Sequence, residues 1–96
     1  MRKYEITFIV RPDLEEAEIT KTADELKKLL KNGKAKLESE KVEGQKELAY
    51  EIKKFTTGYY FLYVVEANIE TINEFDRVAK INENLLRHLI VKVEEK

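Results

Sequence analysis

The chain of 96 residues contains no cysteine and only one histidine, His88. Without cysteine it can form no disulfide and carries no thiol chemistry, which favours a reducing compartment. One histidine is too few for a histidine-rich metal site, so we expect neither a metal nor another cofactor. The chain also has no apolar run of the roughly 20 residues that a membrane-spanning helix requires.

An excess of charge of either sign is also missing. The 18 basic and 19 acidic residues give a formal net charge of −1. Because most nucleic-acid-binding domains are clearly basic, a contact with nucleic acid would need a local cluster of cations. The first residues lack the form of a signal peptide, since the apolar stretch Ile6–Val10 is short and contains Thr7. We therefore expect one cytoplasmic domain that spans residues 1–96.

A strand and a helix are predicted at the start of the chain. Apolar residues alternate along Tyr4–Val10, as in a half-buried strand, and Pro12 ends the pattern. The helix is predicted over Asp13–Asn32, with Glu16 placed as in a capping box. Its apolar stripe consists of Ile19, Ala23, Leu26 and Leu30.

The remaining elements are predicted from weaker patterns. Ala35–Lys53 is expected to be one long twisted strand, or two pieces joined by a bulge at Gly44. An aromatic strand follows over Tyr59–Glu66, Asn68 can cap a second helix, and a last strand covers Leu85–Val93. The side chains expected to point inward are Leu48, Tyr50 and Ile52 from the long strand and Ile69, Ile72, Phe75, Val78 and Ala79 from the second helix.

The order β-α-β-β-α-β predicts an α+β fold, the ferredoxin-like two-layer sandwich. It has a four-stranded antiparallel sheet with both helices on one face. We expect Leu26 and Leu30 to pack against Ile6, Phe8 and Leu48.

The aromatic strand does not fit a sheet with one bare face. Tyr59, Phe61 and Tyr63 lie on one side of it, and Tyr60 and Leu62 on the other, so both sides are apolar. The last strand is apolar on both sides as well. One interpretation is that tyrosines tolerate exposure because their hydroxyls stay hydrated. The other is a partner or ligand on the bare face.

Two familiar activities match this pattern poorly. An RNA-recognition motif has the same element order, and Gly58 and Phe61 fall at its signature places, but Thr57 replaces its basic residue. Ferredoxin-like acyl-phosphate hydrolases hold phosphate near the position of Arg11, but an acidic stretch follows that residue here, and no phosphate loop is present. His88 stands in an apolar strand, which is typical of a structural histidine. We therefore expect no enzyme.

Three stretches together resemble the bacterial small-subunit ribosomal protein S6 family. They are "MRKYEITFIVRPDLEE", "LAYEIKKFTTGYY" and "FDRVAKINENLLRHLIVK", and the resemblance covers essentially the whole chain. It implies the fold derived above and a ribosome-associated, cytoplasmic protein. It also implies binding to 16S ribosomal RNA together with ribosomal protein S18, as a heterodimer on the platform of the small subunit.

The resemblance also implies RNA-binding positions, and the fold groups some of them. The ends of the first and last strands should bring Arg2, Lys3 and Lys92 together, with Tyr4 available to stack. One departure lies before "LAYEI", where Glu47 stands at a position that is usually basic in the family. The full predicted RNA-binding set is Arg2, Lys3, Tyr4, Lys46, Lys53, Lys54, Arg87 and Lys92, and the predicted partner-binding set on the bare face is Phe61, Tyr63, Leu89 and Val91.

A second hypothesis is a ferredoxin-like regulatory module that self-associates through the bare face and binds a small metabolite. The glycine-rich ligand loop that is usual in such modules is absent. A monomer in solution would favour the ribosomal hypothesis, and a stable homodimer the regulatory one.

Overall fold

The computed structural model describes residues 2–93, and the elements follow one another in the predicted order. The predicted charged end of the chain, residues 94–96, lies outside the described residues. The elements are β1 (Arg2–Val10), α1 (Glu16–Asn32), β2 (Lys36–Ile52), β3 (Phe55–Ala67), α2 (Ile69–Ile81) and β4 (Leu85–Lys92).

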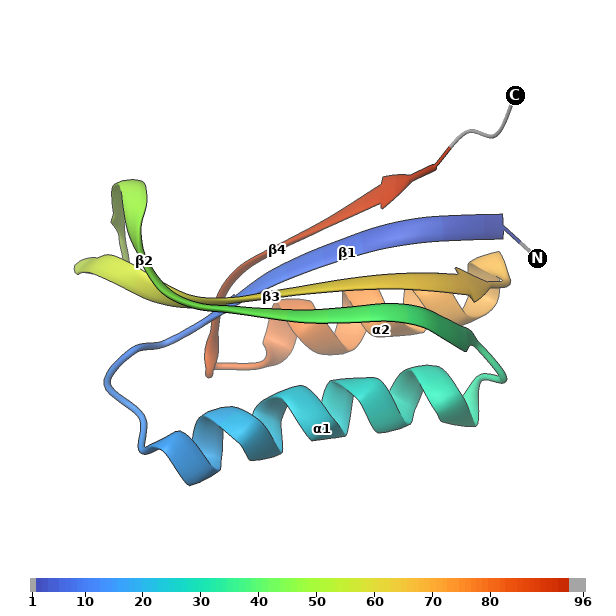
Figure 1. Cartoon of the computed structure of the whole chain (residues 1–96), viewed down its shortest axis with the longest axis horizontal. Helices are drawn as coiled ribbons and strands as arrows, with labels where there is room; N and C mark the ends of the chain where they lie inside the picture. The colour runs from blue at the N-terminus through green and yellow to red at the C-terminus, as the bar shows by residue number, and fades with distance from the viewer. Residues whose placement is uncertain (1, 94–96) are drawn as a thin grey trace.

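The four strands form one antiparallel sheet in the order β2-β3-β1-β4. Both helices lie against the same face of this sheet, and the other face carries no helix (Figure 1). We call this second face the open face. The predicted ferredoxin-like sandwich is therefore confirmed, and so is the predicted pairing of the first strand with the last.

The hydrophobic core lies between the sheet and the helices. Glu5 is exposed and Thr7 is partly exposed, whereas Ile6 and Phe8 are completely buried, so the even-numbered residues of β1 point into the core. The predicted stripe of α1 covers them from the other side. All of its members are buried in the same cluster, namely Ile19, Ala23, Leu26 and Leu30.

The start of α1 differs from the prediction. The helix begins at Glu16, with Glu15 at the N-cap position, and the Glu15 side chain makes no capping hydrogen bond. Asp13 forms no capping box because its carboxylate accepts two hydrogen bonds from the Arg11 guanidinium, at 3.1 and 2.8 Å. The predicted end of the helix is confirmed, with Gly33 at the C-cap position.

The second helix begins where predicted. The side-chain oxygen of Asn68 accepts a hydrogen bond of 2.9 Å from the backbone N–H of Thr71. Ile69 was expected in the apolar stripe but is 57% exposed. With 3.6 residues per turn, Ile69 lies about 60° to the side of Ile72, and at the helix end this directs it to solvent. The confirmed buried residues of the stripe are Ile72, Phe75 and Ala79, with Val78 half-buried.

The aromatic strand is turned the opposite way from the prediction. Ile6 of β1 pairs with Tyr63, and Phe8 pairs with Phe61. Directly paired residues share one face of a sheet, so the odd-numbered residues of β3 join the core. Phe61 is 4% exposed and Tyr63 is 1% exposed, and the ring of Phe8 stacks on Phe61 with 4.9 Å between centroids. Their predicted position on the open face is therefore wrong.

A β-bulge interrupts the alternation of β4. The extra residue is Leu86, which falls between the positions of β4 that pair with Ile9 and Val10. Leu85 consequently lies in the core, whereas Leu89 lies on the open face. Without this bulge the two leucines would share a face, as the simple odd–even pattern implied.

β2 and β3 extend beyond the other strands as a long hairpin, whose end bends away from the helices (Figure 1). β2 is one continuous strand with the predicted irregularity at Gly44, where φ is 84°. The hairpin loop consists of Lys53 and Lys54 alone, between the paired residues Ile52 and Phe55. Both lysines have a positive φ, of 49° and 72°, as a two-residue type I′ turn requires. β3 therefore begins earlier than predicted.

The inward face predicted for Leu48, Tyr50 and Ile52 is not formed as expected. The pairing shifts between Glu47 and Ile52, so the period-two alternation is lost in this stretch. Tyr50 is 58% exposed, and Leu48 and Ile52 are only half-buried outside the core cluster.

A second, smaller group of apolar side chains lies on the open face at the base of the hairpin. It consists of Ile9, Leu48 and Leu86, which surround Gly58. A Cβ at Gly58 would lie only 2.2 Å from the Cγ2 of Ile9, so glycine is required for this close approach. Ile9 and Leu86 are buried without any helix above them.

Candidate functional site

The middle of the open face carries apolar side chains in two columns. Leu62 of β3 and Leu89 of β4 flank Thr7 of β1, and in the next row Val64 and Val91 flank Glu5. The two β4 residues are the most exposed of these, at 58% for Leu89 and 44% for Val91. We call Leu62, Val64, Leu89 and Val91 the apolar strip. Its predicted members Leu89 and Val91 lie where the prediction placed them.

One end of the strip carries three of the predicted RNA-binding cations, Arg2, Lys3 and Lys92. Lys92 pairs with Tyr4, and the N–H of Val93 donates a 2.9 Å hydrogen bond to the carbonyl of Lys3. The backbone thus brings the three cations together, and we call them the terminal basic patch. Arg2 and Lys92 are exposed on the helix-side face, while Lys3 is on the open face and forms an ion pair with Glu38 at 3.5 Å.

Tyr4 does not take part in this patch. The predicted RNA-stacking residue is 6% exposed and belongs to the hydrophobic core. The reason is its position on β1, where even-numbered residues face the helices. An RNA base has no access to a ring in that place, so the predicted stacking by Tyr4 is wrong.

The other predicted cations lie at the hairpin end of the sheet. Arg87 pairs with Ile9 near the far end of β1, and Lys46 of β2 pairs with Gly58. Ile9 lies seven residues along β1 from Arg2, which corresponds to roughly 24 Å of strand. The structure therefore divides the predicted cations into two groups. The second group, which we call the hairpin patch, consists of Lys46, Lys53, Lys54 and Arg87, all exposed.

Two aromatic rings at the surface accompany the hairpin patch and were not among the predicted site residues. The guanidinium carbon of Arg87 lies 5.7 Å from the ring centroid of Tyr50, and the Nζ of Lys46 lies 5.8 Å from that of Tyr60. Both distances fall within the range of cation–π contacts. Lys46 also forms an ion pair with Glu43. In this pair the Lys46 ammonium donates a hydrogen bond that lowers the pKa of the Glu43 carboxyl. Sequence spacing gives no sign of these pairs, because they join residues far apart in the chain.

His88 and Arg11 are held by neighbouring carboxylates. The Nε2 of His88 lies 2.7 Å from the Oδ1 of Asp76, which links β4 to α2. Hydrogen bonds from His88 and Lys80 lower the pKa of Asp76. The guanidinium of Arg11 donates two hydrogen bonds to the Asp13 carboxylate. Both residues therefore have structural partners.

Within residues 2–93, no group of three or more acidic, histidine or cysteine side chains is placed to hold a metal ion. No helix in the same range is long and apolar enough to cross a membrane.

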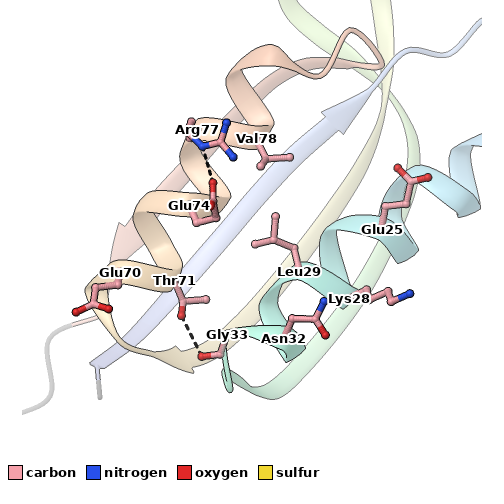
Figure 2. A pocket seen from close by; sticks show the side chains of 10 residues that line it. All are labelled: Glu25, Lys28, Leu29, Asn32, Gly33, Glu70, Thr71, Glu74, Arg77 and Val78. Carbon is pink, nitrogen blue, oxygen red and sulfur yellow. Dashed lines mark hydrogen bonds and ion pairs between the residues drawn. The ribbon is translucent and has the colours of Figure 1, made fainter.

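A groove of about 550 Å3 lies between the two helices. Figure 2 shows Leu29 of α1 and Val78 of α2 facing this groove, and the hydroxyl of Thr71 donating a 3.0 Å hydrogen bond to the carbonyl of Gly33 at one end. Charges of both signs surround it, so it does not favour a ligand of one charge. They belong to Glu25, Lys28, Glu70, Glu74 and Arg77.

A ferredoxin-like sandwich with an apolar strip on its open face and exposed cations at both ends of the sheet is typical of a binding protein of the α+β class. The family model described as ribosomal protein S6 matches residues 3–92, and the chain belongs to this family. Its structure is similar to that of 30S ribosomal protein S6 from Thermotoga maritima, with a TM-score of 0.91 and 26% identity over 96% of this chain and 87% of that chain. The resemblance read from the sequence is thus confirmed. The chain is a small-subunit ribosomal protein of an RNA-binding family that acts in translation.

Proposed function

We propose that this chain is a non-enzymatic structural component of the small ribosomal subunit in the cytoplasm, and that it binds 16S ribosomal RNA as a heterodimer with ribosomal protein S18. Membership of the S6 family over residues 3–92 is the observation that carries this proposal. The layout of the sheet supports it, because the open face offers an apolar docking area and the adjoining end of the sheet carries the exposed cations Arg2 and Lys92 on its helix-side face.

The apolar strip is the proposed contact with S18. Exposed apolar patches of this kind mark interaction surfaces in monomeric proteins. Leu89 and Val91 are its most exposed members, and Glu5 between the columns offers an anion to a basic side chain of the partner. Phe61 and Tyr63 have no part in this contact, because they lie beneath the helices.

The terminal basic patch is the proposed phosphate-binding site. With a formal net charge of −1, the chain attracts RNA only through local clusters of cations. Arg2 and Lys92 are exposed and share the helix-side face, whereas Lys3 is partly neutralised by Glu38. We therefore assign most of the phosphate attraction in this patch to Arg2 and Lys92.

Replacing both Arg2 and Lys92 by alanine is expected to weaken binding of the heterodimer to platform RNA. It should also flatten the dependence of log affinity on log salt concentration by roughly one unit per lost phosphate contact. A filter-binding titration at several salt concentrations measures both quantities. The matched control is Arg77→Ala with Lys80→Ala, which removes two exposed cations from α2. If the Arg2/Lys92 variant keeps the affinity and slope of the parent, the terminal patch is not the RNA site.

Co-sedimentation tests the proposed function as a whole. The native protein is expected to migrate with small ribosomal subunits in a sucrose gradient, and the isolated chain is expected to be a monomer. A chain that stays at the top of the gradient and forms a stable homodimer would contradict the ribosomal proposal and favour the regulatory module.

A further inference from the structure

The hairpin end of the open face carries two aromatic rings, each with a cation beside it. Tyr50 is 58% exposed and has the Arg87 guanidinium 5.7 Å from its centroid. Tyr60 is half-buried and has the Lys46 ammonium at 5.8 Å. Neither tyrosine belongs to the hydrophobic core between sheet and helices. These two pairs are therefore a feature of the surface.

The two pairs lie on the same well-packed part of the sheet. Arg87, Ile9 and Tyr60 form one cross-strand row, so the backbones of Arg87 and Tyr60 lie about 10 Å apart, which is two strand spacings. Ile9 fills the space between them and is 8% exposed. Below the row, the backbone of Gly58 approaches Ile9 closely. This packing holds the tyrosine ring of β3 and the arginine of β4 in a defined relative position.

Charge alone gives this region little attraction for phosphate. Residues 41–54 contain four lysines and three glutamates, so their formal charges nearly cancel. The Glu43 carboxylate also pairs with Lys46. The hairpin end instead presents planar groups, namely two phenol rings and the guanidinium of Arg87. Aromatic rings and guanidinium planes are the side-chain groups on which unpaired RNA bases stack.

We propose that the hairpin end of the open face is a stacking site for unpaired RNA bases, formed by Tyr50 with Arg87 and by Tyr60 with Lys46. This inference rests on the proposed RNA-binding function and assigns different parts of the RNA to the two ends of the sheet. The terminal basic patch holds phosphates whether or not the bases are paired, whereas the hairpin end accepts only bases that are free of a duplex.

The test compares two RNA probes of equal length, a single-stranded oligoadenylate and a perfect duplex, on the full-length chain at low salt. Fluorescence anisotropy should show tighter binding of the single strand. In NMR spectra, the ring protons of Tyr50 and Tyr60 should move upfield as the single strand is added, because a stacked base shields them. The duplex should leave these signals in place.

Two variants separate stacking from charge and from folding. Tyr50→Leu combined with Tyr60→Leu should weaken single-strand binding by about fivefold to a hundredfold for each base that loses its ring, and leave duplex binding unchanged. Arg87→Lys removes the guanidinium plane, so it should lower single-strand affinity. Because the variant keeps the charge, its salt slope should stay that of the parent. Circular dichroism with thermal unfolding checks that each variant is folded.

The outcomes distinguish this inference from the function on which it rests. Equal affinity for both probes, or folded tyrosine variants that bind like the parent, would overturn the stacking site and leave the terminal patch as the RNA site. Tyrosine signals that respond only to ribosomal protein S18 would assign the hairpin end to the protein partner instead. If neither the chain nor its heterodimer binds any RNA, the proposed function fails as well.

Discussion

Phe61→Asp is expected to unfold the protein. The Phe61 side chain is 4% exposed and stacks on Phe8, so the substitution removes a ring and places a carboxylate in the core. Loss of a buried phenylalanine alone costs about 3–5 kcal/mol, and burial of an unpaired charge adds several more. A typical domain is stable by only about 5–15 kcal/mol. Far-UV circular dichroism and urea titration at neutral pH should show little or no folded protein.

Leu89→Asp is the matched control, since it places the same charge on the open face. Leu89 is 58% exposed, so the free energy of unfolding of this variant should lie within about 1 kcal/mol of that of the parent. Its heterodimer with ribosomal protein S18 should nevertheless be weaker by tenfold or more in a calorimetric titration, as expected for a charge within an apolar interface. A folded Phe61→Asp protein would refute the assigned face of β3. Unchanged affinity of Leu89→Asp would remove the apolar strip as the S18 contact.

Leu30→Ala is expected to lower the free energy of unfolding by about 2–5 kcal/mol. Leu30 is 2% exposed and packs in the cluster that contains Ile6 and Phe8, so the truncation leaves a cavity between α1 and the sheet. Urea denaturation with a common m-value measures the loss. Leu29 is half-buried and lines the groove between the helices. Leu29→Ala should therefore lower the free energy of unfolding clearly less than Leu30→Ala. A loss below about half a kcal/mol at Leu30 would contradict the two-layer packing.

The helices and the element order were predictable because their signals are local. A stripe such as Ile19, Ala23 and Leu26 repeats with the helical period and needs no knowledge of other segments. The cap at Asn68 is local as well. At the start of α1 the local rule failed because a nearby side chain competed. Asp13 binds Arg11 instead of capping α1, and the sequence does not indicate which of these two contacts is preferred.

The candidate site was predictable only in part. The backbone pairing of the first and last strands follows from the topology, and it brings Arg2, Lys3 and Lys92 to one end as expected. The burial of Tyr4 follows from which face of β1 the helices cover. The rings beside Arg87 and Lys46 were missed, because such contacts depend on the bend and register of the hairpin.

The sequence by itself determined the order of elements, most of the buried face of each helix and the family. All three depend on local periodicity or on recurring stretches of residues. Only the tertiary structure decided which side of the aromatic strand is covered. A strand that is apolar on both sides carries no alternation, so its orientation is set by the pairs Ile6–Tyr63 and Phe8–Phe61. Likewise, the bulge at Leu86 arises from pairing with β1, and it directs Leu85 to the core and Leu89 to the open face.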